Sequence, residues 1–283
     1  MAYFSTDPVQ AAAREAGYPQ ATLNLLGEPG GKFVCEVLPR KYEKVEKKGL
    51  TGGKIDCPAR EDAVRILRGV VKRAVEMLDS TIDKLTKARE AVCRGERLGW
   101  SNPGDVMACW LKYRLRVCIE DPSVWTKGTF ESGTVAEVIR RLVRPRNLIA
   151  SNQITYVCDA TCTSPSTYAW VKVTEAGVCI PNPKEIIHLC PPFWTAAHAK
   201  FREQTIIHEA VHLTHCAATE DEGTRVTIGS PECLTQFVAA TNGMVLDPEF
   251  KHRCGLTAKC GPIPKECRAI FRVKSSALPD WKP

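Results

Sequence analysis

The sequence predicts an α+β fold that is mainly helical, with a small β-sheet and one helix that carries a His-Glu-x-x-His pattern. Three observations lead to this prediction. Apolar residues recur every seven positions between Asp62 and about Arg94, which indicates a long amphipathic helix. After residue 150 the chain turns to short β-prone runs separated by Ser, Thr, Pro and Gly. A later helical stretch then holds three of the chain's six histidines.

Two further helices are predicted in the first half of the chain. The run "DVMACWLKYRLRVCIED" predicts a helix that Pro122 closes, and "TVAEVIRRLVR" predicts one that Pro145 closes. Proline ends a helix because it has no N–H to donate. Residues 1–58 are rich in Gly and Pro and predict an irregular segment.

The second half predicts a sheet followed by two helices. We expect a sheet of three or four strands from four short runs: "QITYVCD", "TYAWVKV", "GVCI" and "EIIHLC". A helix should then run from about Thr195 to Cys216. Ser230 and Pro231 are the expected N-cap and first position of the next helix, which Asn242-Gly243 should end.

These elements divide the chain into four parts. We expect an irregular N-terminal segment, a helical subdomain, a part with the sheet and the histidine-rich helix, and a Cys- and Pro-rich tail, at residues 1–58, 59–150, 151–245 and 246–283. Residues 59–245 should form one compact domain, and cross-links should tie down the tail.

Fourteen cysteines, none of them in a Cys-x-x-Cys pair, dominate the composition. This pattern is typical of a disulfide framework in an oxidising compartment. The chain starts with neither a basic n-region nor an apolar h-region, so its start does not predict a secretory signal. We therefore expect a secreted or exported protein that has no recognisable signal peptide. Reduced, buried cysteines would instead indicate a cytoplasmic protein.

The bulk composition narrows the partners. Hydrophobic residues make up 44% of the chain and charged residues 25%, which predicts a globular protein with a real core. No run approaches the ~18 apolar residues of a membrane span. The net charge of +7 favours anionic surfaces such as a cell wall or an acidic host protein, but it is too dispersed to predict specific nucleic-acid binding.

The stretch "TIIHEAVHLTHC" contains the strongest chemical pattern of the chain. Residues four apart on a helix point the same way, so His208 and His212 can each place a ring nitrogen about 2.1 Å from one Zn²⁺. Glu209 lies off their line and can take a proton from a zinc-activated water. The alternative is an ordinary core helix, but two unpaired imidazoles in an apolar core would be costly. The pattern therefore predicts a catalytic zinc ion.

A third protein ligand is needed, and two acids are candidates. Asp221 lies nine residues after His212, in a loop that could fold back over the metal, while Glu232 opens the following helix. His215 could share the face of the other two histidines, but three imidazoles from one helix would crowd a tetrahedral ion. We expect it beside the site or at the surface. The other histidines are predicted to be structural or to lie in the tail: His188, His198 and His252.

The stretch "IHLCPPFWTAAHAKFREQTIIHEAVHLT" resembles the aspzincins, the deuterolysin and lysine-specific metalloendopeptidase family. The resemblance implies a zincin-like fold, with His208 and His212 as zinc ligands and Glu209 as the catalytic glutamate. Asp221 of "TED" then matches the third ligand. The likeness extends over about residues 150–242, and over 60–150 in outline.

The chain departs from this family near the reacting centre. The family has a tyrosine three residues after the aspartate, placed to stabilise the oxyanion, where this chain has Thr224. Either that role is taken by another residue, with Thr224, Arg225, His215 and the remote Tyr168 as candidates, or stabilisation of the transition state is weaker. Lysine-specific members receive the substrate lysine with acids on the next helix, where this chain has Glu232 and Thr235. "ECLTQF" also resembles the helix of gluzincins whose glutamate binds zinc, which leaves Glu232 as an alternative ligand.

Together these features predict a zinc-dependent endopeptidase that cleaves proteins or peptides and favours basic residues next to the scissile bond. One alternative is a peptidoglycan amidase or endopeptidase, whose anionic polymer suits the positive net charge. The other is a non-catalytic effector or binding protein on the same fold, which the missing tyrosine would favour.

Overall fold

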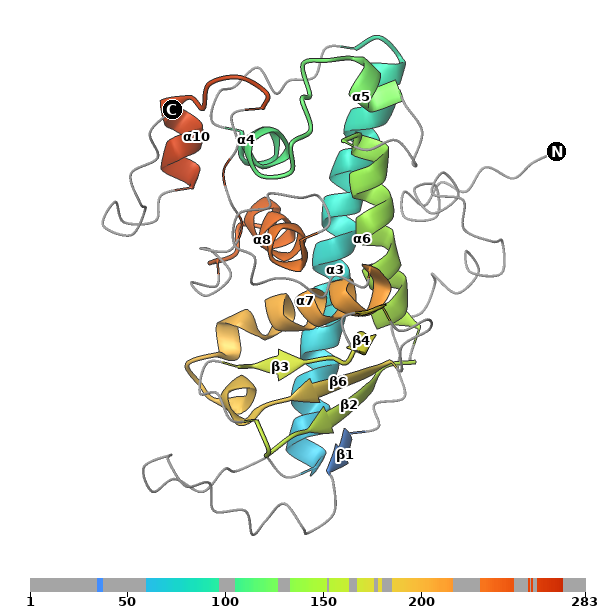
Figure 1. The fold of residues 1–283 in the computed structure, drawn as a ribbon, viewed down its shortest axis with the longest axis vertical. Helices are drawn as coiled ribbons and strands as arrows, with labels where there is room; N and C mark the ends of the chain where they lie inside the picture. Colours follow the sequence, from blue (N-terminus) through green and yellow to red (C-terminus); the bar gives the residue numbers. More distant parts are fainter. Residues whose placement is uncertain are drawn as a thin grey trace, which may run out of the picture. The chain divides into compact units, whose positions relative to one another are not determined.

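The computed structural model describes residues 35–37, 60–96, 105–126, 133–151, 153–162, 167–175, 178–179, 185–215, 230–246, 254, 256 and 259–271. It confirms the predicted α+β, mainly helical class (Figure 1). The chain divides into two compact units, residues 1–18, 80–140 and 219–283 in the first and residues 19–79 and 141–218 in the second. We describe each by itself. The four-part division along the sequence stays a prediction.

The long amphipathic helix is confirmed as α3, Arg60–Cys93. Its heptad positions Leu78 and Leu85 are fully buried, as the seven-residue spacing requires. The helix ends at Cys93. Two residues later Gly95 has a φ of +78°, which favours glycine, and the Gly95 N–H donates to Val92 O at 2.8 Å. Both α3 and α6, Val135–Ala150, contribute residues to the two units.

The expectation that Pro145 closes a helix is wrong, because α6 continues through Pro145 to Ala150. A proline inside a helix removes one N–H, and the carbonyl that loses its helical donor lies four residues earlier, on Arg141. The ring of His215 lies 2.9 Å from that oxygen through Nε2 and replaces the missing donor.

The second predicted helix is also shorter than expected. The helix α4, Val106–Tyr113, ends well before Pro122. Asp105 caps its first turn with a carboxylate oxygen. Just beyond its end Arg116 has a φ of 61°, a left-handed conformation that no continuing helix can contain. A short helix, α5 (Ser123–Thr126), follows the proline instead.

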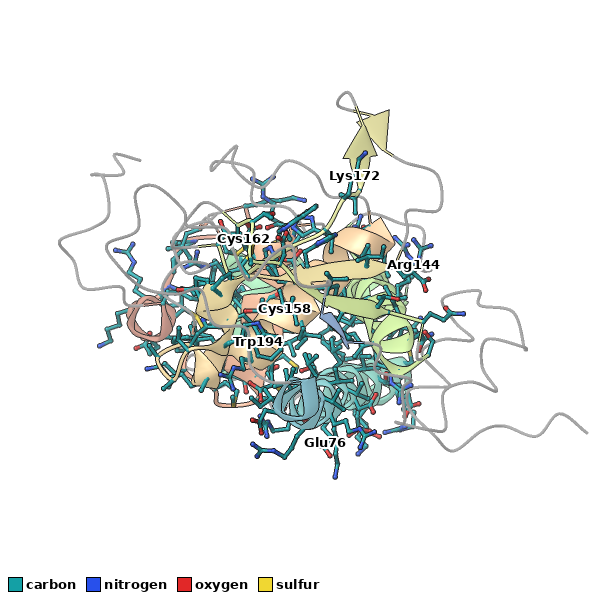
Figure 2. All side chains as sticks on the ribbon, turned by 90° about the horizontal axis from the view of Figure 1, so that it is seen from below. Glu76, Arg144, Cys158, Cys162, Lys172 and Trp194 are labelled. Atoms are coloured by element: carbon teal, nitrogen blue, oxygen red, sulfur yellow. A yellow bond between two sulfur atoms is a disulfide. The ribbon has the colours of Figure 1, made fainter. Side chains whose placement is uncertain are left out.

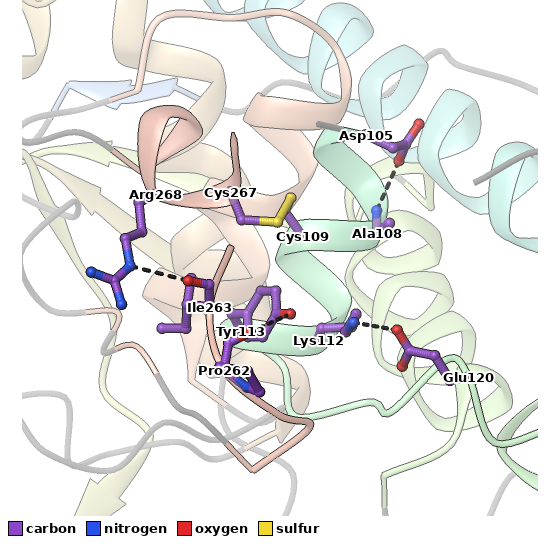
Figure 3. The surroundings of a disulfide bond; sticks show 10 residues. All are labelled: Asp105, Ala108, Cys109, Lys112, Tyr113, Glu120, Pro262, Ile263, Cys267 and Arg268. Atoms are coloured by element: carbon purple, nitrogen blue, oxygen red, sulfur yellow. Dashed lines mark hydrogen bonds and ion pairs between the residues drawn. A yellow bond between two sulfur atoms is a disulfide. The ribbon is translucent and has the colours of Figure 1, made fainter. Parts of the chain in front are cut away.

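Disulfides hold the last part of the chain to the first unit, as predicted for the tail. Among the described cysteines, three such bonds lie in this unit: Cys109–Cys267, Cys118–Cys260 and Cys233–Cys254. The first joins α4 to α10, Lys265–Ile270, and beside it the Tyr113 hydroxyl donates to Pro262 O at 3.2 Å (Figure 3). Because this cross-link spans 158 positions, it lowers the entropy of the unfolded chain and raises the free energy of unfolding by about 5 kcal/mol.

The second unit contains the sheet, in the order β1-β2-β6-β3. Its strands are β1 (Cys35–Val37), β2 (Thr155–Cys158), β3 (Ala169–Trp170) and β6 (Ile186–Leu189). The first three in space are parallel, and β3 is antiparallel to β6. This confirms the small sheet of three or four strands. A hairpin of β4 (Thr174–Glu175) and β5 (Val178–Cys179) follows Lys172 and projects from the sheet (Figure 2).

A fourth disulfide, Cys162–Cys190, joins the chain after β2 to the end of β6. The four bonds confirm a disulfide framework and indicate an oxidising environment. None of the helices in the described residues combines the length and apolar character that crossing a membrane requires.

Candidate metal centre

The chain approaches the histidine-rich helix through two 3₁₀ turns, η2 (Pro191–Trp194) and η3 (Ala199–Phe201). The α-helix that follows, α7, spans Arg202–His215 and starts later than predicted. Thr195 cannot begin it because its backbone is extended, with a ψ of 153°. The guanidinium of Arg202 donates to two backbone carbonyls of η2 at 2.8 Å each, which fixes the first turn of α7.

Contacts on several sides hold α7 in place. Its apolar residues Ile206 and Val211 are fully buried. Near the N-terminus, Glu203 pairs with Arg73 of α3. At the same end, Nε2 of His198 lies 2.8 Å from the hydroxyl of Thr205. The helix also contacts the edge strand β3. A rigid helix is what a preorganised metal site requires.

His208 and His212 face each other in the interior of the second unit. Their side chains are 3% and 7% exposed, and their Nε2 atoms lie 3.2 Å apart. Two nitrogen ligands at about 2.05 Å from one tetrahedral zinc would be about 3.3 Å apart. The two imidazoles therefore fit a shared zinc ion, which is the soft-to-borderline metal that nitrogen donors favour.

Glu209 follows His208 on the same helix and is 5% exposed. As predicted, one short stretch of helix thus holds two nitrogen donors and a buried acid. Its assignment as the general base stays a prediction.

The described residues do not identify a third ligand for these two histidines. No set of three or more His, Cys, Asp or Glu side chains there is placed to hold a metal. Asp221 and the oxyanion candidate Thr224 lie outside the described residues. Glu232 belongs to the first unit, where it is 1% exposed and lies in the first turn of α8, Pro231–Thr241.

The ends of α8 agree with the prediction. The Ser230 hydroxyl accepts from Cys233 N and donates to Glu232 Oε2 at 2.9 Å, and Pro231 takes the first position. Asn242 is the C-cap, followed by Gly243 with a φ of 67°. These caps were readable from sequence because each rests on the chemistry of a single residue.

The two remaining oxyanion candidates have other contacts. The Tyr168 ring stacks on His198, with ring centroids 3.6 Å apart and an interplanar angle of 13°. The His215 ring donates to Arg141 O on α6. Neither contact tests the oxyanion role directly. His188, predicted to be structural, stacks under Trp170 at 3.8 Å, and the indole N–H donates to Asp159 at 2.9 Å.

Two polar features escaped the sequence reasoning. One is the hydrogen bond between His198 and Thr205, which lies seven residues later. The available sequence signal for this bond was a polar residue in the first turns of α7. The other is Gln236, which is fully buried on α8 with Glu232 and Thr235. Their spacing of three and four places all three on one face of the helix.

Acid should destabilise the protein through His198. Burial, and secondarily the charge of Arg202, lowers its pKa to about 4. Between that value and about 6.5 the unfolded chain binds the proton more tightly, so the free energy of unfolding falls as the pH is lowered across this window, by roughly 3 kcal/mol. Urea unfolding of metal-free protein from pH 7 to pH 4 measures it. H198Q keeps a donor for Thr205 and should lose this part of the pH dependence. Equal slopes for both proteins would contradict the assignment.

A buried His-Glu-x-x-His helix in an α+β fold defines the class of zinc metallopeptidases. Residues 125–228 match the family model of the aspzincins, described as lysine-specific metallo-endopeptidase. This match confirms the predicted resemblance and indicates a zinc metallopeptidase. The matched range includes α7 and Asp221 and ends before Glu232. No curated protein and no solved structure matches the chain significantly.

Proposed function

We propose that the protein is a zinc-dependent endopeptidase in which His208, His212 and Asp221 hold the ion and Glu209 is the general base. The observation that carries this proposal is the 3.2 Å separation of the two histidine Nε2 atoms on one buried helix. The family match over residues 125–228 supports it. The disulfides support a secreted or exported protein.

In the proposed hydrolysis, the bound zinc and Glu209 have separate roles. Bound zinc lowers the pKa of a coordinated water toward ~7 and polarises the peptide carbonyl. Glu209 accepts a proton from the attacking water and then delivers it to the leaving amine nitrogen as the C–N bond breaks. Because Glu209 is almost fully buried, its charge acts where bulk water screens it little.

The edge strand β3 favours an extended polypeptide as substrate. It lies at the end of the four-stranded order and contacts α7. Within the described sheet it pairs on one side only, and a strand at the edge of a sheet can pair with an extended chain through its backbone.

The polar residues of α8 support the proposed preference for basic residues, which the family resemblance implies. Glu232, Thr235 and Gln236 are at most 1% exposed. Thr235 Oγ1 has no hydrogen-bond partner within the described part of the chain. We propose that this face receives the basic side chain next to the scissile bond, since an ammonium group can donate to all three oxygens.

A peptide library read by mass spectrometry tests the proposal. The zinc-loaded protein should cleave peptides with Lys or Arg enriched next to the cut. E232Q should reduce kcat/KM for these sites by about thirtyfold, as expected when a desolvated charge loses its partner. The matched control is E137Q, because Glu137 is also a buried acid in the first turn of a helix and accepts from Gly133 N at 2.8 Å. It should keep the preference.

Peptidoglycan is a second candidate substrate, which the net charge of +7 favours. Purified cell wall and casein digested side by side separate the two. Cleavage of cell wall without cleavage of any peptide would overturn the endopeptidase proposal. Bound zinc with no cleavage of either would favour a binding protein or effector.

A further inference from the structure

The last turn of α7 is joined to α6 by a hydrogen bond to the carbonyl that loses its helical donor to a proline. Pro145 cannot donate to Arg141 O, and His215 Nε2 lies 2.9 Å from that oxygen. Figure 1 shows the C-terminal end of α7 reaching α6. We propose that His215 is a positioning residue that locks the final turn of α7 and thereby holds His212 in its metal-binding orientation. The proposal rests on the proposed function only for its zinc readout.

The chemistry of the acceptor fixes the state of the His215 ring. A carbonyl oxygen can only accept, so Nε2 must carry a hydrogen. That nitrogen is therefore not a metal donor in this arrangement. The contact joins residues 74 positions apart, which makes it a tertiary link between two helices rather than a local cap.

The position of His212 explains why such a link matters. His212 and His215 both lie in the last turn of α7. Helix ends fray because their final carbonyls lack helical partners. The other histidine ligand, His208, lies one turn earlier, so of the two histidines it is His212 that depends on an ordered final turn. Removing a residue that orients a metal ligand lowers the metal affinity by about tenfold to a hundredfold.

A purely structural role must be separated from a positioning role. Alanine at position 145 would restore an N–H that can serve Arg141 O from within α6. In that background the loss of His215 no longer leaves the carbonyl without its donor, but it still releases the end of α7. Stability and zinc affinity should then respond differently to the same substitution.

The test uses the full chain with H215L and H215Q, each with and without P145A. H215L should lower Tm of the metal-free protein by about 3–8 °C and weaken zinc binding by about tenfold or more, measured by competition with a chelating dye. H215Q can place an amide N–H near the position of Nε2, so it should stay within about threefold of the parent in zinc affinity. With P145A, the Tm loss of H215L should shrink by at least about half, while the zinc loss persists.

Two results would overturn the proposal. One is H215L binding zinc as tightly as the parent. The other is recovery of zinc affinity together with Tm in the double variant, which would reduce His215 to a support for α6. A parent that binds zinc but cleaves no substrate would overturn the proposed function alone, because neither readout here depends on catalysis.

Discussion

Replacing Glu209 with Gln should lower kcat for peptide cleavage by about a hundredfold to ten-thousandfold, the range that a general base contributes. Glutamine has nearly the same shape but cannot accept the proton of the attacking water. Zinc should stay bound at one ion per chain, because the histidines of the metal site are unchanged. Steady-state kinetics and metal analysis on the same preparation measure both effects.

E203Q is the matched control for this experiment. Glu203 is also a buried acid on α7, 4% exposed at its side chain, but it pairs with Arg73 and has no place in the proposed chemistry. The variant should lose stability and keep kcat within about threefold, since the change breaks an ion pair that joins α7 to α3 and touches no group of the proposed chemistry. If E209Q cleaved peptides as fast as the parent, Glu209 would not be the base.

Elements whose signals are local could be predicted from the sequence. The seven-residue spacing gave α3 almost to its ends, and Ser230 with Pro231 gave the start of α8. In both cases one periodic face or one capping side chain determines the element. The shared face of His208 and His212 could be predicted in the same way, because side chains four positions apart lie on one face of any helix.

Elements that depend on distant partners could not be predicted from the sequence. Where α6 continues past Pro145, the donor to Arg141 O comes from the distant His215, which a local rule about proline does not contain. The same holds for α4, whose early end coincides with the left-handed Arg116 rather than with Pro122. The third ligand is harder still to predict, because Asp221 and Glu232 are both acids at a plausible sequence spacing from His212.

Asp221→Ala should therefore be the most informative change at the metal. If Asp221 is the third ligand, the variant should bind zinc at least about a hundredfold more weakly, since two imidazoles alone do not complete a site with three protein ligands. E220A and E222A remove the acids that neighbour Asp221 in the sequence and carry the same change of charge. They should stay within about threefold of the parent in a chelator-competition titration.

E232Q in the same titration separates the two candidate ligands. Glu232 Oε2 already accepts from the Ser230 hydroxyl, and a carboxylate in the first turn of α8 is stabilised by the helix dipole. These contacts give Oε2 and the carboxylate charge partners other than a metal, and the family match ends before Glu232. E232Q should therefore change zinc affinity by less than about fivefold while it lowers cleavage at basic residues. The opposite pattern, tight binding in D221A and weak binding in E232Q, would make Glu232 the ligand. Glu232 on the polar face of α8 would then bind the metal rather than the substrate.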